Sequence, residues 1–253
     1  MKLQNFLQAN EMNIFAIDTS QKTVSVAIMA DHLIVADIFI DSGRHHSEVI
    51  MPAIQQAFLL AALTPEEIDL FALTVGPGSF TGLRIGAATI KGIALSTGKP
   101  VVGVSTLEAL ALNLVHAENK IICPMLDAQK NQIYTALFRV EDDRTVERIG
   151  KEVVIDVDRW LQALDCEPLF LGDGAMKYAQ KVQTWRSSTS CGKVNSDRHF
   201  VKAAAVAALA SKIYQRGEQL DLLRFAPQYL RPSEAEIRVG QQTSNIDKSL
   251  QLS

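Results

Sequence analysis

Two acidic residues, each at the end of an apolar segment, are the first candidates for chemistry in this sequence. Asp18 ends residues 13–18 and is followed by Thr19, and Asp127 ends residues 120–127. A carboxylate in such a turn can hold a metal ion and, through it, the phosphates of a nucleotide. The alternative is that each acid only caps its own turn. The sequence therefore allows a nucleotide cleft at Asp18, Thr19 and Asp127, but we favour the structural role.

The segment Gly76-Pro77-Gly78-Ser79 is a second candidate, because it precedes a predicted helix. Free backbone N–H groups at a helix N-terminus can bind an anion. The segment is not a Walker A loop, since no Gly-Lys-Ser or Gly-Lys-Thr follows. Ser79 also lacks the glycine two residues earlier that a nucleophile elbow has. We therefore expect a structural turn in which Ser79 caps the helix.

The histidines and cysteines predict neither a metal site nor a catalytic residue. His45 and His46 are adjacent, and no acid or histidine follows at a metal-binding spacing. We expect Ser47 to cap the next helix and Glu48 to lie in its first turn. Three cysteines, odd in number and far apart, favour a reducing cytoplasm over a disulfide framework. No nucleophile–base pair supports a peptidase.

A helix predicted from Ser79 to Thr97 is the element around which the rest is organised. It is small or apolar on nearly all sides, and Gly98 is expected to end it. Each of its glycines, Gly82, Gly86 and Gly92, costs about 1 kcal/mol relative to alanine. A helix of this kind is normally covered on all sides. We therefore expect one face to lie on the sheet of its own lobe and another to be closely approached by a partner helix.

The order of elements predicts a duplicated α/β fold with mixed sheets. Three strands, a helix, a strand and a second helix are expected in the first half, and the same order recurs from residue 120 onward. Asp18 and Asp127 occupy corresponding places in the two halves. We predict a first lobe at residues 12–105, a second lobe at 106–232 and a polar, mobile tail at 233–253. Helices are expected over residues 47–62, 79–97, 107–117, 157–164, 175–185 and 200–216.

Length and composition fit this organisation. The chain has 253 residues, a formal net charge of −3 and a hydrophobic content of 47%. That is enough for a substantial core, and the nearly balanced charge argues against strong nucleic-acid binding by this chain alone. No stretch is expected to span a membrane, and the first residues do not have the pattern of a signal peptide. We therefore expect a cytoplasmic protein.

Several motifs together resemble the TsaB (YeaZ) family of the tRNA threonylcarbamoyladenosine pathway. The most specific is the run GPGSFTGLRIG at residues 76–86, and the matches extend from Ile14 to about Arg231. The chain departs from the family pattern at residues 129–131, where an arginine and a glycine are common. The other matching segments are Ile17-Asp18-Thr19-Ser20, His46-Ser47-Glu48 with Pro52, residues 103–110, Leu126-Asp127-Ala128, Gly172-Asp173-Gly174-Ala175 and Tyr229-Leu230-Arg231.

The resemblance implies an actin-like (ASKHA) fold and an indirect function. Members of this family are degenerate paralogues of the catalytic subunit TsaD. They pair with a TsaD-like subunit, recruit a TsaE-like ATPase and form homodimers through the same face. The complex transfers a threonylcarbamoyl group to the adenosine beside the tRNA anticodon, so this chain would meet tRNA only indirectly. We expect a non-catalytic scaffold without a bound cofactor or metal, with ATP or ADP possible only at the complex.

The partner interface implied by the resemblance lies on the helices over residues 47–62 and 79–97. Under this hypothesis Gly86→Leu abolishes pairing while the monomer still folds. The alternative is a nucleotide-dependent phosphotransferase or ATPase that acts from the lobe cleft and binds ATP tightly on its own. The residues expected at the interface are Ser47, Ile50, Ile54, Phe58, Phe80, Thr81, Gly82, Leu83, Gly86, Ile90 and Ile93.

Overall fold

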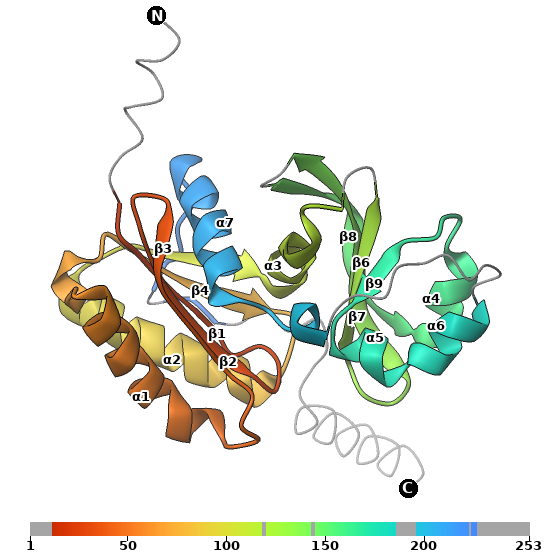
Figure 1. The fold of residues 1–253 in the computed structure, drawn as a ribbon, viewed down its shortest axis with the longest axis horizontal. Helices are drawn as coiled ribbons and strands as arrows, with labels where there is room; N and C mark the ends of the chain where they lie inside the picture. Colours follow the sequence, from red (N-terminus) through yellow and green to blue (C-terminus); the bar gives the residue numbers. More distant parts are fainter. Residues whose placement is uncertain (1–11, 118–119, 143–144, 186–195, 223, 227–253) are drawn as a thin grey trace, which may run out of the picture.

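The computed structural model describes an α/β protein with two lobes side by side (Figure 1). The described residues are 12–117, 120–142, 145–185, 196–222 and 224–226. The predicted tail at 233–253 and the Tyr229-Leu230-Arg231 segment lie outside them. None of the helices in the described part is long and apolar enough to cross a membrane.

The first lobe is built on a mixed sheet with the strand order β3-β2-β1-β4-β5. β2 is antiparallel to β1 and β3, whereas β4 is parallel to β1 and β5. Two long helices, α1 (His46–Ala61) and α2 (Phe80–Thr97), cover one face of this sheet (Figure 1). The strands are β1 (Ile14–Asp18), β2 (Val24–Ala30), β3 (Leu33–Ile40), β4 (Leu70–Gly76) and β5 (Val101–Ser105).

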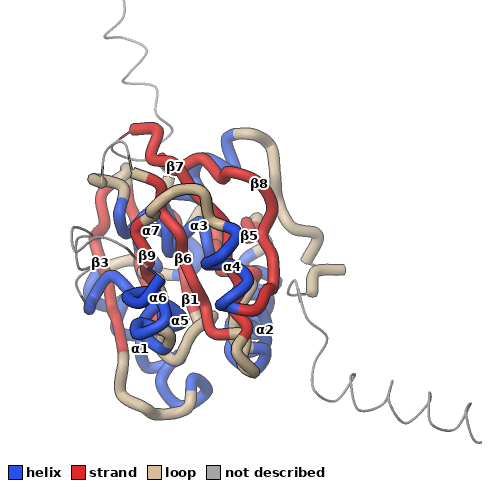
Figure 2. Tube along the Cα trace, turned by 90° about the vertical axis from the view of Figure 1, so that its right-hand side faces the viewer, coloured by secondary structure: helices blue, strands red, loops and turns tan. Residues whose placement is uncertain are grey.

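The second lobe repeats this plan on a smaller scale, with the strand order β8-β7-β6-β9. β6 is antiparallel to β7 and parallel to β9, as β1 is to β2 and β4. The repeat confirms the predicted duplicated α/β fold. Figure 2, which views the molecule from the second-lobe side, shows its short helices α4, α5 and α6. The elements are β6 (Ile121–Asp127), β7 (Gln132–Asp142), β8 (Thr145–Asp156), α4 (Val157–Ala163), β9 (Leu169–Leu171), α5 (Asp173–Lys177) and α6 (Ala179–Trp185).

The largest hydrophobic core joins the two lobes. Ile14 and Leu70 from the first sheet, and Ile122 and Phe138 from the second, belong to one buried cluster with Leu107 of α3. α3 (Thr106–Ala111) and the 3₁₀ turn after it (Leu112–Leu114) thus form the junction between the sheets. Since both lobes bury apolar surface in this cluster, their relative position is part of the fold.

Helix α7 corrects the predicted division of the chain. α7 (Ala203–Gln215) falls within the segment 106–232 assigned to the second lobe, yet it packs against β1, β2, β4 and β5. Figure 1 shows α7 in blue on the first-lobe side, across the sheet from α1 and α2. The first sheet has two apolar faces, and α1 and α2 cover only one of them. α7 supplies the missing cover on the other.

Some predicted helix boundaries were wrong. Ser47 does not cap α1, because the helix already begins at His46 and His45 is the cap residue. The helix predicted over 107–117 ends as an α-helix at Ala111 and continues as a 3₁₀ turn. The helix predicted over 175–185 is two short helices, α5 and α6, that meet at Tyr178. The spacing of apolar residues indicates which face of a helix is buried, but it does not indicate where the helix axis bends.

Candidate functional site

The turn after β1 is covered by the N-terminal half of α2. A Cβ atom at Gly78 would lie 2.4 Å from the carbonyl oxygen of Ser20, and one at Gly82 only 2.0 Å from that of Thr19. At Gly86 it would lie 2.4 Å from Thr19 Oγ1. No side chain fits at these separations, so the glycines let the helix pack directly onto the turn.

The carboxyl group of Asp18 lies beneath this helix and is completely buried. Its Oδ1 accepts hydrogen bonds from Thr74 Oγ1 (2.6 Å), Ser20 Oγ (2.6 Å) and Ser20 N (3.2 Å). Within the described part of the chain, Oδ2 has no hydrogen-bond partner. The three bonds tie the end of β1 to β4 and to the turn.

The buried position changes the acidity of this group. Burial raises the pKa of Asp18 from its ordinary 3.8 to about 6, although hydrogen bonds from Ser20 and Thr74 and the charge of His46 lower it. Because the side chain has no exposed surface, a metal ion or a phosphate could reach it only if α2 separated from the turn. The geometry therefore favours the structural role of Asp18 over the nucleotide-binding role.

The N-terminus of α2 is also engaged within the chain. Ser79 Oγ accepts a hydrogen bond from Gly82 N (3.2 Å), which confirms the predicted helix cap. Ser79 N donates to Ser20 O (2.7 Å), and Thr19 Oγ1 donates to Gly82 O (2.8 Å). At least one of the N–H groups considered for anion binding thus already has a partner in the turn.

Asp127, the counterpart of Asp18, is held by residues of its own lobe. Its Oδ2 accepts hydrogen bonds from Lys177 Nζ (2.6 Å) and Gln129 Nε2 (2.9 Å). Its Oδ1 accepts from Gln129 N (3.0 Å) and Tyr178 Oη (3.3 Å). The hydrogen bond to Asp127 raises the pKa of Lys177. The structure thus groups Asp18 and Thr19 with the α2 glycines, and Asp127 with α5.

The turn after β6 has an uncommon backbone at residues 129–131. Gln129, Lys130 and Asn131 all have positive φ, at 62°, 52° and 62°. Non-glycine residues rarely adopt this conformation, and three in a row require support. Asn131 Nδ2 donates to Asp156 Oδ2 (2.6 Å), and Gln132 N donates to Gln129 O (2.9 Å). These bonds hold the turn in this conformation.

Most of the predicted interface residues lie inside the first lobe, which corrects that prediction. The apolar side chains on α1 point into the core against the first sheet, and Gly82 and Gly86 face Thr19 rather than a partner. These residues cannot present their side chains to another protein while the lobe is folded. The buried members of the set are Ile50, Ile54, Phe58, Gly82, Leu83, Gly86 and Ile90.

The remaining predicted interface residues stay candidates. Ser47 and Thr81 are exposed, and Phe80 and Ile93 are partly buried. The proposed test with Gly86→Leu is no longer suitable, because a side chain there would collide with Thr19 Oγ1. That variant would disturb the fold before it could report on pairing.

The outward faces of α1 and α2 carry residues that the sequence analysis did not select. Leu59 is 73% exposed and Leu60 62%, while Leu95 of α2 is 56% exposed. Ala88 and Gly92 are exposed on the same helix, and a Cβ at Gly92 would meet no described atom within 4 Å. The sequence did contain a signal for this outward face. It has apolar or small residues on the side of each helix opposite the regularly spaced residues that are buried.

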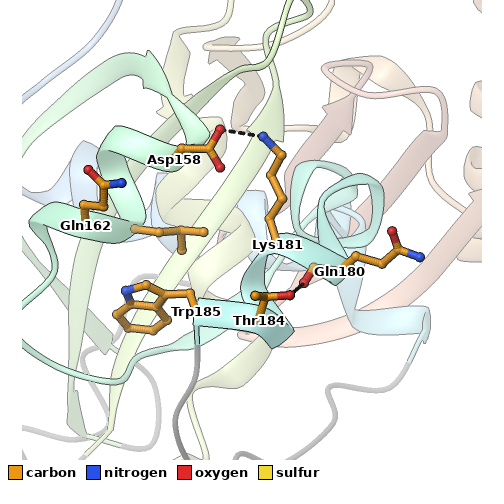
Figure 3. Close-up of a pocket in the computed structure, with 7 residues that line it drawn as sticks. Asp158, Gln162, Gln180, Lys181, Thr184 and Trp185 are labelled. Carbon is orange, nitrogen blue, oxygen red and sulfur yellow. Dashed lines mark hydrogen bonds and ion pairs between the residues drawn. The ribbon is translucent and has the colours of Figure 1, made fainter.

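A separate hollow of about 330 Å³ lies on the second lobe between α4 and α6. Figure 3 shows Trp185 and Gln162 at its wall and the ion pair between Asp158 and Lys181, whose N–O distance is 2.6 Å. No residue predicted for function lines it. Among the described residues, no group of three or more His, Cys, Asp or Glu could hold a metal ion.

Comparisons with known proteins extend this picture. The model of the family described as "TsaD: tRNA N6-adenosine threonylcarbamoyltransferase" matches residues 40–239. The "tRNA threonylcarbamoyladenosine biosynthesis protein TsaB" of Bacillus subtilis (strain 168) is 30% identical over 231 residues, which cover 90% of this chain and 97% of that protein. The protein of the same name from Escherichia coli (strain K12) is 28% identical, covering 88% and 96%.

The chain belongs to the TsaB family. The solved structure described as "YeaZ from Pseudomonas aeruginosa" has the same fold, with a TM-score of 0.73, 22% identity and coverage of 86% of this chain and 99% of that one. The TsaB resemblance inferred from the glycine-rich motif is thereby confirmed, as is its fold. In this TsaB protein the motif at 76–86 forms the β4–α2 connection that covers the Asp18 turn.

Proposed function

We propose that this protein acts in tRNA threonylcarbamoyladenosine biosynthesis as a non-catalytic subunit. In this role it pairs with a TsaD-like transferase, recruits a TsaE-like ATPase and meets tRNA only through the complex. The names of the B. subtilis and E. coli relatives support the pathway. The observation that carries the pairing is the apolar outward face of α1 and α2.

This outward face has the properties of a helix-packing surface. Met51, Leu59 and Leu60 of α1 and Leu95 of α2 are each at least 46% exposed. Gly92 has open space above it, so another helix can approach the backbone of α2 closely. A stable interface of standard size covers about 800 Å² on each partner. Burying these side chains in such an interface would remove exposed apolar surface from water.

The burial and hydrogen bonding of Asp18 and Asp127, the candidate nucleotide-binding acids, support a non-catalytic role. Asp18 is fully buried and hydrogen-bonded, and Asp127 is paired with Lys177 and Gln129. Neither carboxylate is available to a metal–phosphate group in this conformation. We therefore propose that the isolated chain binds no cofactor, with ATP or ADP held only at the assembled complex.

The pairing can be tested with Leu95→Glu, since Leu95 is exposed and the variant should fold. We expect it to lose co-purification with a TsaD-like subunit and to convert a homodimer into a monomer in light scattering. The matched control is Met176→Glu on α5, which also places a charge on an exposed apolar residue, 47% exposed, but on the other lobe. Normal pairing by folded Leu95→Glu would contradict this use of α2.

The role in the pathway needs a separate measurement. Threonylcarbamoyl transfer to tRNA should require the TsaD-like subunit, the TsaE-like ATPase and this chain together. Isothermal titration of the isolated chain with ATP should give no binding heat. Tight ATP binding that Asp18→Ala abolishes would instead support a phosphotransferase or ATPase acting from the cleft.

A further inference from the structure

Gln21 connects two distant parts of the chain through its side chain. The residue lies three positions after Asp18 and is 3% exposed. Its Nε2 donates to the carbonyl oxygen of His199 at 3.2 Å, and its Oε1 accepts from the backbone N–H of Val201 at 2.9 Å. Residues 199–201 belong to the segment that returns from the second lobe to α7. The amide group of Gln21 therefore hydrogen-bonds the crossover backbone on both sides of Phe200.

The side chain of Gln21 also lies near the second lobe. Burial raises the pKa of Asp173, the first residue of α5, and the nearby side chain of Gln21 lowers it. Asp173 Oδ1 in turn accepts a hydrogen bond from Asp127 N at 3.1 Å. On the crossover, the ring nitrogen Nδ1 of His199 lies 3.1 Å from the backbone N and O of Gly172. The turn after β1 is thus linked to the second lobe through Gln21, the crossover and the ring of His199.

The backbone of Gln21 contacts the first lobe's helical layer. Its carbonyl oxygen lies 2.9 Å from Nε2 of His46, the first residue of α1. Four residues further along the same hairpin, Ser25 Oγ accepts a hydrogen bond from Ala203 N at the start of α7. Gln21 therefore lies where α1, the crossover and α5 meet.

We propose that Gln21 is the lock that fixes the angle between the two lobes and, through His46, the position of the start of α1. The lobes are also joined by the hydrophobic cluster around α3, which sets distance but little direction, and by a hydrogen bond from Ser105 of β5 to Glu152 of β8. Hydrogen bonds are directional, and a buried amide that loses its partners leaves several polar groups unsatisfied. A rotation of the lobes that moved the crossover would break both hydrogen bonds of this side chain at once.

The lock needs a group that both donates and accepts. Glutamine supplies an N–H donor for His199 O and an oxygen acceptor for Val201 N. Methionine has nearly the same length and volume but forms neither bond with useful strength. Gln21→Met therefore removes the lock while it keeps the packing. The control is Gln129→Met, which changes the glutamine in the corresponding second-lobe turn, whose side chain bonds Asp127 of its own lobe.

The full-length chain should be studied by hydrogen exchange and by distances between spin labels. Labels placed at the exposed positions 55 of α1 and 180 of α6, in a background with Cys166 and Cys191 changed to serine, report the lobe angle. For Gln21→Met we expect a broader distance distribution. We also expect amide exchange at 199–203 and 172–178 to be about tenfold faster, while β4 is unchanged. Gln129→Met should match the parent protein in both measurements.

The other possible outcomes would contradict the proposal. Unchanged distances and unchanged exchange in Gln21→Met would show that packing alone sets the lobe angle. Equally faster exchange in β4 would show that Gln21 only supports the overall fold. Gln21→Glu provides a second test, since it keeps the acceptor for Val201 N, loses the donor and places a second carboxylate near Asp173. We expect it to loosen the lobes at least as much as methionine does, and a rigid variant would overturn the proposal.

Discussion

The two turns that follow β1 and β6 occupy the same place in the duplicated fold but differ in what covers them. The glycine-rich helix α2 presses on the first turn, and Asp18 beneath it has no exposed surface. The second turn is open enough for Asp127 to pair with Lys177, whose side chain is 45% exposed. Both lobes thus have an acid at this position, but the surroundings of the two acids differ.

This difference teaches that the position of an acid in the fold does not determine its chemistry. Asp18 lies in a low-dielectric interior with one oxygen hydrogen-bonded and the other without a described partner. Asp127 has charged and polar partners for both oxygens. The first carboxyl is therefore sensitive to pH and to the packing around it.

The largest effect is expected from a substitution at the close contact between α2 and the turn after β1. In Gly82→Ala the new methyl group would lie 2.0 Å from Thr19 O, a backbone atom that cannot move without β1. We expect a loss of about 3 kcal/mol or more in the free energy of unfolding, measured with urea.

The matched control for this contact is Gly92→Ala, in the same helix with open space above it. There the higher helix propensity of alanine should stabilise the protein by up to about 1 kcal/mol. Similar effects of the two substitutions would show that α2 does not press on the turn as described.

The second prediction concerns the pH dependence of Asp18. Its pKa is raised to about 6 in the folded state, so the folded protein binds this proton more tightly than the unfolded chain does. The resulting stabilisation is full below the ordinary pKa of 3.8 and is lost as the pH rises through 6. Relative to Asp18→Asn, the natural protein should lose about 2 kcal/mol between pH 4 and pH 8.

Urea unfolding at several pH values measures this difference, and Asp127→Asn serves as the comparison in the other lobe. A parallel pH profile for the natural protein and Asp18→Asn would mean that the buried carboxyl has an ordinary pKa. The two lobes would then not differ in the way proposed.

The smallest expected effect belongs to the ion pair of the second turn. Lys177→Met removes the 2.6 Å contact with Asp127, but the lysine is partly in water and Gln129 and Tyr178 still bond the carboxylate. We expect a change below about 1 kcal/mol, which becomes smaller still in high salt. Thermal unfolding at low and high salt is sufficient, and a loss as large as that of Gly82→Ala would contradict the contrast between the lobes.

The sequence was informative where a signal is local. Ser79 and Gly98 marked the ends of α2, and the repeated order of strands predicted the duplicated fold. Thr64 and Glu67 form a capping box in the structure, another feature set by residues close together in the sequence. Such features depend on neighbours within a few residues, which a single sequence displays directly.

The candidate site was harder to predict, because it depends on which side of a helix faces which neighbour. Glycines in α2 indicated a close approach, but nothing local showed that Gly82 and Gly86 meet Thr19 while Gly92 faces outward. Ile54 and Phe58 were selected as apolar contact residues, and they are buried because helical spacing of this kind marks the core first. Gln21 gave no signal, since its partners lie almost 180 positions away.

The return of α7 to the first lobe has a consequence for how the protein is made. The face of the first sheet that α7 covers includes Ile14, Ala27 and Val102. Without α7, this face lacks its cover until residues 203–215 leave the ribosome. The N-terminal lobe therefore cannot mature on its own before the second has been synthesised, although domains usually fold in order of synthesis. A nascent chain stalled before residue 203 should remain sensitive to protease and bound by chaperones, and release of α7 should end both conditions together.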